Sequence, residues 1–389
     1  MSTIEGGAGF ASGAPGFVFG RPPRTASEQL SSTKTPHERQ VWHALPPPTG
    51  EPPFRLELAA VLGEAAVAGI AKAGRLVFHT LGDTGGIDNP YPQLIVAQWL
   101  EHDAAEHAPA FLYQLGDVVY YDGEHGAYYQ QFYEPYLRYP APIFAIPGNH
   151  DTDVGVPPNH TALEPFMANF CAARPQHLLD AREVERTTMI QPNCYWTLNT
   201  PLATIVGLAT NAPEHGEVRH DQADWLEGEL RDAPRDRALI VALHHPPLSA
   251  DDHHGASSAM RDLLDSAFAK AGRVPDLVLS GHVHNYQRFQ RKLANRQTLT
   301  YVVAGAGGYP NLHNMAKVEG EPPPIPWTDP VSGYTVVNYS KEHRHGFLRL
   351  GITRSQIRGV YTTVPRPQES WSDGPVTPID HFQIRIKRP

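Results

Sequence analysis

Short apolar runs bounded by turn residues recur along the chain from residue 75 onward. The most regular of them are 75–81 (RLVFHTL), 110–115 (AFLYQL), 142–147 (PIFAIP), 238–243 (ALIVAL), 276–280 (DLVLS) and 300–305 (TYVVAG). Runs of this length that end at Gly- or Pro-containing turns are typical of strands buried on both faces. The pattern therefore predicts a sheet whose strands lie inside the molecule.

Helix-like segments separate several of these predicted strands. They cover residues 91–105, 128–137, 222–231 and 259–271. Alternation of buried strands with helices favours an α/β architecture, in which helices cover both faces of the sheet. Residues 191–210 differ, because two strand-like runs flank a tight NTP turn and predict an antiparallel hairpin at a sheet edge.

The two ends of the chain and one internal tract have weaker periodicity. Residues 1–50 are rich in Gly, Pro, Ser and Thr and are interpreted as an extended arm, whereas 54–74 predicts a helix weakened by Gly63 and Gly69. The Gly/Pro-rich tract 306–345 is long for a loop of a compact domain, so we expect a functional lid. The predicted parts are an N-terminal extension (1–74), a main domain (75–365) and a tail (366–389) with a terminal strand in HFQIRIK.

The charge and composition of the chain disfavour several classes of function. The 389 residues contain 32 Lys and Arg against 41 Asp and Glu, a net charge of −9, without a dense basic run. A surface that binds nucleic-acid phosphates is normally basic, so we disfavour that role. No apolar stretch is long enough for a transmembrane helix, and the N-terminus lacks the pattern of a signal peptide, so we expect a cytoplasmic location.

Cysteine is scarce in this chain and histidine is frequent. Cys171 and Cys194 are the only two cysteines, against 21 histidines. Two thiols cannot build a disulfide framework or a four-thiolate zinc site. We interpret them as small buried apolar residues, and whether they pair stays open.

Five short polar motifs follow directly on five of the predicted strands. They are GDTGG (82–86), GDVVYYDG (116–123), GNHD (148–151), HHPP (244–247) and GHVH (281–284). Because ligands of open α/β sheets lie outside the carboxyl ends of the strands, we expect these motifs to gather on one rim. The side-chain donors that they deliver are Asp83, Asp117, Tyr120, Asn149, His244, His282 and His284. Such a set is too large for one ion, but with one bridging carboxylate it suits two metals about 3.5–4 Å apart.

Each motif taken alone has an ordinary structural explanation. A Gly-Asp pair after a strand is commonly a turn, Tyr120 could be a packing aromatic beside Tyr121, and His282 and His284 could be surface residues. The two histidines of GHVH nevertheless share one face of an extended chain. Burial of Asn, His and Asp together in GNHD is costly unless they are paired or bound to metal. Five such motifs, each after a strand, favour a metal centre.

This ordered set of motifs resembles the calcineurin-like metallophosphoesterase superfamily over about residues 76–305. Within the superfamily it is most similar to the purple acid phosphatase branch. Most members carry Asp-x-His at the first motif, whereas here Gly85 stands where the His would be, and Tyr120 follows Asp117 by three residues. The resemblance implies a four-layer α-β-β-α sandwich of mixed sheets flanked by helices, with 75–365 as the catalytic domain.

The resemblance also implies which residues hold each metal ion. The first ion would be held by Asp83, Asp117, Tyr120 and His284, and the second by Asp117, Asn149, His244 and His282. A phenolate in place of an imidazole favours a harder ion, which in that branch is Fe(III). The second ion is then a divalent one, Fe, Zn or Mn, because metal availability counts as much as ligand type.

Three further histidines are expected to serve the substrate. In the resembled family the residue at His150 contacts the substrate phosphate, and Asp151 beside it is expected to orient its ring. His253 and His254, nine and ten residues after His244, resemble a His pair at the substrate mouth of plant-type members. The alternative for that pair is a solvated polar loop. We assign no role to the neighbouring His245.

Three functions stay open at this point. The first is an acid phosphatase-like hydrolase of small phosphate monoesters that uses attack by a metal-bound hydroxide. The second is a phosphodiesterase for cyclic nucleotides, nucleic-acid ends or phospholipid head groups, with nucleic acid only as a substrate. The third is a metal-binding scaffold without catalysis, which the complete set of ligands disfavours. We expect no membrane partner.

Overall fold

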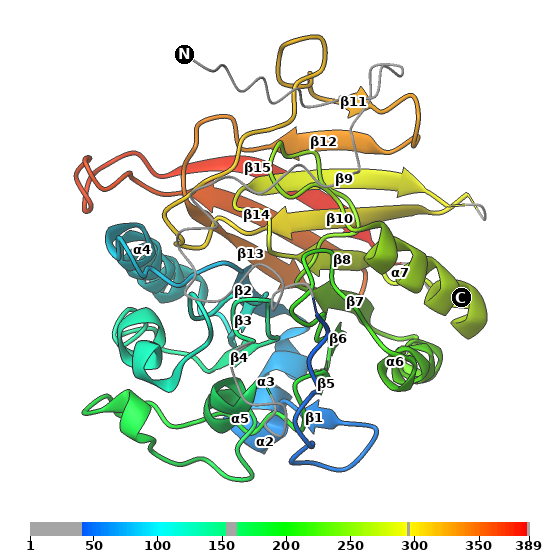
Figure 1. Cartoon of the computed structure of the whole chain (residues 1–389). Coiled ribbons are helices and arrows are strands. Elements are labelled where there is room, and N and C mark those ends of the chain that lie inside the picture. Colours follow the sequence, from blue (N-terminus) through cyan, green and yellow to red (C-terminus); the bar gives the residue numbers. More distant parts are fainter. Residues whose placement is uncertain (1–40, 153–161, 294–295, 387–389) are drawn as a thin grey trace.

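The computed structural model describes residues 41–152, 162–293 and 296–386. Two mixed β-sheets pack face to face in this part of the chain, and helices cover their outer sides (Figure 1). The predicted four-layer sandwich of mixed sheets flanked by helices is confirmed. Residues 1–40, most of the predicted N-terminal arm, lie outside the described residues.

The first sheet has nine strands in the order β1-β5-β6-β7-β8-β10-β9-β12-β11. Its strands are β1 (Arg55–Glu57), β5 (Trp196–Asn199), β6 (Ala203–Gly207), β7 (Ala238–Leu243), β8 (Leu277–Ser280), β10 (Thr298–Ala304), β9 (Tyr286–Lys292), β12 (Thr335–Tyr339) and β11 (Trp327–Thr328). Strands β6, β7, β8 and β10 are mutually parallel. Their carboxyl ends therefore reach the same edge of the sheet.

The second sheet has six strands in the order β15-β14-β13-β2-β3-β4. Its strands are β15 (Thr377–Arg385), β14 (Gln356–Thr363), β13 (Gly346–Ile352), β2 (Leu76–Leu81), β3 (Leu112–Gln114) and β4 (Ile143–Ala145). Strands β2, β3 and β4 are parallel, and the other pairs are antiparallel. Each of the six predicted buried strands is present in one of the two sheets.

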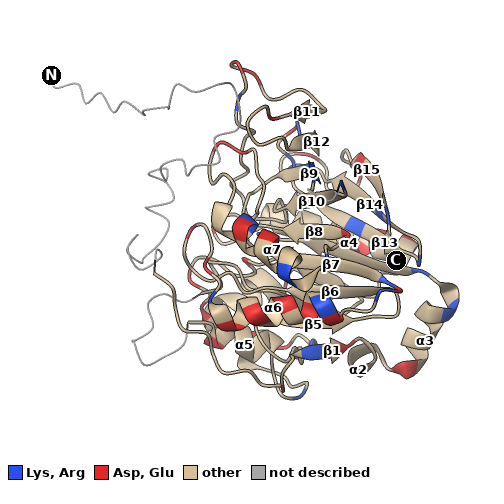
Figure 2. Cartoon of the chain, turned by 90° about the vertical axis from the view of Figure 1, so that its right-hand side faces the viewer, with Lys and Arg blue, Asp and Glu red and all other residues tan. Residues whose placement is uncertain are grey.

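Helices flank the outer sides of the two sheets. They are α2 (Ala59–Leu62), α3 (Glu64–Ala73), α4 (Tyr91–His107), α5 (Glu164–Phe170), α6 (His220–Asp232) and α7 (Ser258–Ala271), with single turns η2 (His125–Ala127), η3 (Tyr129–Tyr133) and η4 (Leu179–Ala181). Of these, α2 and α3 lie near β1 at one end of the molecule (Figure 1, Figure 2). Helices α6 and α7 flank the nine-stranded sheet, whereas α4 and α5 lie on the opposite side of the molecule, beside the six-stranded sheet (Figure 1). On the side of α6 and α7, both helices carry acidic and basic side chains (Figure 2).

Strand β7 shows why the strands read as unbroken apolar runs. Ile240 and Ala242 point into the core between the two sheets. Leu239, Val241 and Leu243 point the other way, into a second core beneath α6 and α7. Since successive side chains alternate between faces, a strand covered on both sides must be apolar at every position.

Two predicted helices have a different structure. Residues 54–74 form β1 and two helices rather than one, because Gly63 adopts φ +81° and interrupts the chain between α2 and α3. Residues 128–137 form only a π-helical turn, Tyr129–Tyr133, followed by further turns. The packing of aromatic rings at this turn overrides its helical sequence pattern.

The edges of the sheets also differ from the sequence-based prediction. The hairpin β5–β6 is confirmed, but β1 pairs outside β5, so the hairpin is not the edge. The tract 306–345 contributes β11 and β12 to the nine-stranded sheet and is not a loop throughout. The terminal strand is confirmed and begins earlier than predicted, at Thr377. The division at residues 74 and 365 stays a proposal, since β1 and β15 on its far sides both extend the sheets.

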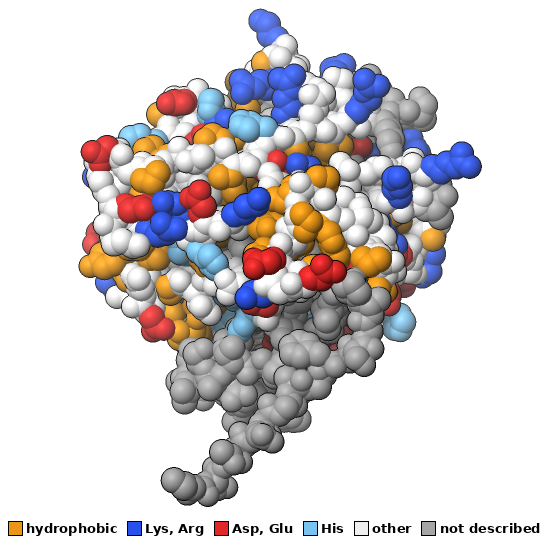
Figure 3. Space-filling view, turned by 90° about the horizontal axis from the view of Figure 1, so that it is seen from above, with side chains coloured by type: hydrophobic (Ala, Val, Ile, Leu, Met, Phe, Trp, Pro, Cys, Tyr) orange, Lys and Arg blue, Asp and Glu red, His pale blue; other side chains and the backbone are white. Residues whose placement is uncertain are grey.

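The mixed surface charge and the two buried cysteines agree with what the composition of the chain predicts. On the face seen from above in Figure 3, Lys and Arg are mixed with Asp and Glu. None of the described helices combines the length and apolar character needed to cross a bilayer. Cys171 and Cys194 are both buried and unpaired with each other.

One buried ion pair links the two sheets. Arg288 of β9 donates to both carboxylate oxygens of Asp380 of β15, at 2.6 and 3.0 Å. The hydroxyl of Tyr286 donates to the same carboxylate at 2.6 Å. Burial acts to raise the pKa of Asp380, but the hydrogen bonds from Arg288 and Tyr286 outweigh it and lower that pKa.

We expect Asp380→Ala to lower the free energy of unfolding by about 3 kcal/mol, because Arg288 would stay buried without its partner. Urea unfolding measures this change. Asp236→Asn, which removes the exposed partner of Arg237, serves as the control and should change stability by less than about 1 kcal/mol. Folding lowers the pKa of Asp380, so its ionised carboxylate stabilises the folded protein at a pH above its unfolded pKa. This stabilisation is lost as the pH falls through its folded pKa. Equal effects of the two substitutions would contradict this role.

Candidate metal centre

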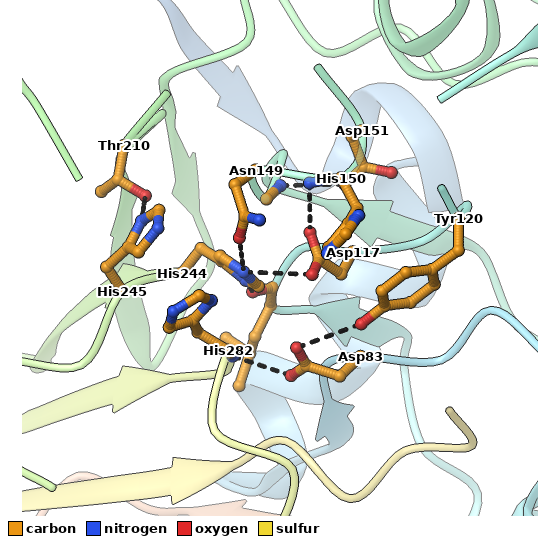
Figure 4. A network of polar contacts seen from close by, with 12 residues as sticks. Asp83, Asp117, Tyr120, Asn149, His150, Asp151, Thr210, His244, His245 and His282 are labelled. Atoms are coloured by element: carbon orange, nitrogen blue, oxygen red, sulfur yellow. Dashed lines mark hydrogen bonds and ion pairs between the residues drawn. The ribbon is translucent and has the colours of Figure 1, made fainter. Parts of the chain in front are cut away.

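The predicted donors meet where the carboxyl ends of both sheets come together. Asp83, Asp117 and Asn149 follow β2, β3 and β4 of the six-stranded sheet, whereas His244 and His282 follow β7 and β8 of the nine-stranded sheet. Figure 4 shows these five side chains converging on one space. The rim expected at the edge of a single sheet is thus shared by two, and each sheet supplies part of the site.

The first half of the site combines oxygen donors with one imidazole. The hydroxyl of Tyr120 lies 3.5 Å from Oδ1 of Asp83 and 3.3 Å from Nε2 of His284. Nε2 of His284 is also 3.5 Å from Oδ1 of Asp83. Nδ1 of His284 donates to the carbonyl of Asn311 at 2.8 Å, so a neutral ring directs its Nε2 lone pair toward Tyr120 and Asp83. Together with Asp117, these are the donors expected for the first ion.

The second half of the site surrounds one imidazole nitrogen with acceptors. Nε2 of His244 lies 3.0 Å from Oδ1 of Asn149 and 3.4 Å from Oδ2 of Asp117, while Nδ1 donates to the carbonyl of Leu115 at 2.8 Å. Burial acts to lower the pKa of His244, but Asp117 raises it to about 9. Burial acts to raise the pKa of Asp117, yet the positive charge of His244 holds it well below its ordinary value. The raised pKa of His244 means that Asp117 stabilises a positive charge on the imidazole. The same carboxylate would stabilise a metal cation at this place.

Two buried atoms at the centre lack a hydrogen-bond partner among the described residues. They are Oδ2 of Asp117 and Nε2 of His282. The ligand atoms of Asp117, His244 and His282 lie within 4.8 Å of one another. A buried polar atom without a partner is costly, and a cation shared by these atoms would remove that cost. The donor set therefore fits a pair of metal ions.

Three of the donors sit at strained backbone positions. Asp83, Asp117 and His282 have φ values of +59°, +52° and +66°, in the left-handed region. Such a conformation costs non-glycine residues of order 1–3 kcal/mol and persists only where the surrounding structure enforces it. The main-chain N–H of His282 donates to Oδ2 of Asp83 at 2.8 Å, which ties two of these turns together.

Gly85 makes room for Tyr120. A Cβ atom at Gly85 would lie 2.8 Å from Cδ2 of the Tyr120 ring and 2.2 Å from Oε1 of Gln131. That amide oxygen accepts the main-chain N–H of Tyr120 at 2.9 Å. A side chain at position 85, such as the His of most members of the resembled superfamily, would therefore collide with the ring of Tyr120, so Gly85 and Tyr120 depend on each other. Burial, followed by the charges of Asp117 and Asp83, raises the pKa of Tyr120 well above its usual value, so its phenolate needs a strongly charged cation.

His150 and Asp151 have different surroundings. Nδ1 of His150 donates to the carbonyl of Tyr121 at 2.8 Å, and its main-chain N–H donates to Oδ1 of Asp117 at 2.8 Å. The carboxylate of Asp151 instead accepts main-chain N–H groups of the neighbouring turns, those of Val118, Val119 and Gly148. The expectation that Asp151 orients the ring of His150 is corrected accordingly: Asp151 holds the turn that carries Asp117. Burial, with Asp117 nearby, raises the pKa of Asp151 to about 7.

The structure brings the predicted histidine pair to the metal rim. The ring of His254 lies 4.1 Å from that of His282, and the ring of His253 lies 4.6 Å from His254. Asp251 accepts the main-chain N–H groups of both residues, at 3.0 and 2.8 Å, so it shapes the loop itself. Nδ1 of His254 is 2.8 Å from Oε1 of Glu214.

The sequence interpretation missed three residues at this rim, Glu214, His245 and His313. Glu214 lies in the connection between β6, which ends at Gly207, and α6, which begins at His220, and it does not follow its strand directly as the five motifs do. His245 is buried with Nδ1 2.7 Å from the hydroxyl of Thr210, and its ring lies 4.4 Å from that of His282. His313 comes from the tract 306–345, and its ring stacks 4.3 Å from that of His284. Nothing in the local sequence marks His313.

Comparison with known families agrees with this site. A family model described as calcineurin-like phosphoesterase matches residues 77–286, and the chain belongs to that family. Its members act on phosphate esters through dinuclear metal centres. The predicted resemblance to the superfamily, near its purple acid phosphatase branch, is confirmed.

Relatives with assigned activities cover only part of the chain. Purple acid phosphatase 22 of Arabidopsis thaliana is 26% identical over 63% of this chain and 53% of its own length. The 3',5'-cyclic adenosine monophosphate phosphodiesterase CpdA of Escherichia coli K12 is 29% identical over 46% of this chain and 56% of its own length. The chain thus spans about half the length of these relatives. GAP50, the anchor in the inner membrane complex of Plasmodium, shares the fold, with TM-score 0.53, 15% identity and coverage of 81% of this chain and 90% of its own.

We expect Gly85→Ala to destabilise the protein by about 1–3 kcal/mol and to weaken metal binding, because the added methyl group displaces the Tyr120 ring or Gln131. Thermal unfolding and elemental analysis measure the two effects. Gly69→Ala is the matched control: this position of α3 has nothing within 4 Å of the added atom, and the change should be neutral or stabilising. If Gly85→Ala matched this control in both measurements, the steric link to Tyr120 would be wrong.

Proposed function

We propose that this chain is a dinuclear metal phosphoesterase that hydrolyses small phosphate monoesters, as purple acid phosphatases do. The observation that supports it most directly is the contact of the Tyr120 hydroxyl with Asp83 and His284, at 3.5 and 3.3 Å, in the space left by Gly85. In this arrangement a phenol takes the place that an imidazole has in most of the superfamily.

The donors divide into two proposed sets. Asp83, Asp117, Tyr120 and His284 would hold the first ion, and Asp117, Asn149, His244 and His282 the second. When bound, two such ions polarise the phosphoryl oxygens and make water a stronger nucleophile near neutral pH. We propose Fe(III) for the first position, because a buried phenolate between two carboxylates requires a hard, highly charged ion, and Fe, Zn or Mn as the divalent partner.

The protein's own residues bind and orient the substrate in this proposal. His150 is fixed by its Nδ1–H donation to the carbonyl of Tyr121 and by the packing of its ring 4.5 Å from that of Tyr120, and in this proposal it contacts the substrate phosphate. His254 is fixed by Glu214 and lies beside His282, which suits it to a phosphate oxygen or to the leaving group. His253 lies at the outer side of His254.

Phosphodiester hydrolysis is the second candidate. The partial similarity to the cyclic-nucleotide phosphodiesterase CpdA supports it. Both activities use the same metal pair, so they differ in the surrounding substrate contacts. The pairing of Gly85 with Tyr120 favours the monoester.

Parallel assays with p-nitrophenyl phosphate and bis-p-nitrophenyl phosphate separate the two. We expect kcat/KM to be at least about tenfold higher for the monoester, a difference of about 1.4 kcal/mol in transition-state stabilisation. Asp117→Asn should abolish turnover and reduce bound metal, while the exposed Asp236→Asn should leave both unchanged. A higher kcat/KM for the diester that Asp117→Asn abolishes would make the phosphodiesterase the correct assignment. Metal binding without turnover of either ester would favour the scaffold.

Tyr120→Phe tests the proposed first ion. Iron-loaded wild-type protein should absorb visible light through tyrosinate-to-Fe(III) charge transfer, and the variant should lose this band because it lacks the phenolic oxygen. Stability should fall by no more than about 1–2 kcal/mol, since the ring and its stacking on Tyr309 at 4.2 Å are retained. Tyr195→Phe provides a control with a tyrosine remote from the metal donors. An iron-loaded wild type without the band, or a variant that keeps it, would exclude Tyr120 as a ligand.

A further inference from the structure

A cavity of about 630 Å³ lies at the amino ends of strands β7, β8 and β10, away from the candidate metal centre. Arg237, Asp276 and Thr298 line it at or just before the starts of these three strands. His244 and His282 follow the opposite, carboxyl ends of β7 and β8, and the six residues of β7 span roughly 20 Å at about 3.3 Å each. The cavity is therefore separate from the metal donors, and its volume is in the range of small-molecule sites.

Arginine is the commonest charged residue of this cavity. Five arginines and two acidic residues line it: Arg235, Arg237, Arg273, Arg291 and Arg385, with Asp265 and Asp276. The five arginines come from four separate stretches of the chain, so no basic run in the sequence marks them. On a chain with a net charge of −9, the cavity is a local concentration of positive charge.

Carboxylates neutralise two of the five arginines. Nη1 and Nη2 of Arg291 donate to the two carboxylate oxygens of Asp265, at 2.5 and 2.7 Å. Nε of Arg237 donates to Oδ1 of Asp236 at 3.1 Å. These two guanidinium groups are therefore held by their own ion pairs.

The other three arginines have no such partner. Within the described residues, Arg235, Arg273 and Arg385 hydrogen-bond no carboxylate. Asp276, the remaining acid of the wall, accepts the main-chain N–H of Leu239 at 2.9 Å and acts on Arg273 only through its charge. The cavity therefore keeps more positive than negative charge that is not already paired.

The backbone orients the guanidinium of Arg273. Its Nη1 donates to the carbonyl of Ala233 and its Nη2 to the carbonyl of Pro234, the latter at 2.9 Å, in the turn after α6. These bonds use two of the five N–H donors that a guanidinium offers, and they fix the direction of the others. Burial, followed by the charge of Arg235, lowers the pKa of Arg273. Like charges thus meet at this wall, and an anion between them would relieve their repulsion.

We propose that this cavity binds a small diphosphate, organic or inorganic, at a site separate from the metal centre. Arginine is the side chain best suited to phosphate oxygens, because its planar group donates two parallel hydrogen bonds. Three arginines from separate segments, around a space larger than one phosphate ion fills, favour a ligand with two phosphate groups. Val274 and Leu293, both half-buried, offer apolar surface to an organic part.

Isothermal titration calorimetry of the full chain tests the proposal with methylenediphosphonate, whose P–C–P bridge a phosphoesterase does not hydrolyse. Wild-type protein should bind one equivalent that Arg273→Gln loses or binds at least about tenfold more weakly, because charge-assisted hydrogen bonds are the strong ones. Arg235→Gln and Arg385→Gln should act in the same way. Both positions are exposed, so these variants decide the test if Arg273→Gln disturbs the turn after α6. Arg261→Gln, at the other end of α7, is the matched control and should bind as wild type does.

The comparison among these proteins decides the question. Ligand held at the metal centre is common to all of them and cancels, so the result does not depend on the proposed function. Equal binding by wild type, Arg235→Gln and Arg385→Gln overturns the site, and so does an equal loss in Arg261→Gln. Equal affinity for inorganic phosphate and methylenediphosphonate contradicts a diphosphate ligand. Tighter binding of adenosine 5'-(α,β-methylene)diphosphate than of methylenediphosphonate assigns the site to an organic diphosphate, and equal or weaker binding assigns it to the inorganic ion.

Discussion

The structure depends on the burial of acidic and imidazole groups at the edge shared by two sheets. Asp83, Asp117, His244 and His282 are almost fully removed from solvent at the carboxyl ends of four strands. Removing a charge from water is costly unless an opposite charge compensates it. The sandwich provides the surroundings that keep these groups in place, and the imidazole of His244, 3.4 Å from Asp117, supplies part of the compensation when it is protonated. The two sheets thus position the site, and the polar residues of the site lie at the edge where the sheets meet.

Close approach at this edge explains the residues that carry no chemistry themselves. A Cβ atom at Gly148 would lie 2.1 Å from Oδ1 of Asp117, so only glycine allows the turn after β4 to reach the carboxylate. Gly85 has the same relation to Tyr120. Asp83 and Asp117 themselves have positive φ values, a backbone conformation that costs free energy for residues other than glycine. The surrounding hydrogen bonds keep these strained turns in place. Asp151, with its three main-chain contacts, is one source of that enforcement.

The tract 306–345 connects the rim with the edge of the nine-stranded sheet. Its far part forms β11 and β12, whereas its first part supplies the Asn311 carbonyl and the His313 ring to the site. The Tyr309 ring stacks on Tyr120 at 4.2 Å. The tract is anchored to a sheet at one end and contacts the candidate ligands Tyr120 and His284 at the other, so it forms one side of the candidate site. The ring of His313 lies 4.3 Å from that of His253, so the tract also contacts the loop at 251–254.

The sequence alone predicted the buried strands, and its motifs supplied the candidate donor residues in their order along the chain. Those features are local in the sequence. An apolar run indicates a strand buried on both faces, and a polar motif directly after a strand indicates a position at the end of the sheet. Only the tertiary structure decided that the rim is shared by two sheets, that β1 covers the predicted edge hairpin and that 306–345 contains strands. It alone brought Glu214 and His313 to His254, and it moved Asp151 from the ring of His150 to the backbone of the Asp117 turn. These relations join residues far apart in the chain through packing and hydrogen bonds, and no periodicity or motif spacing records such contacts.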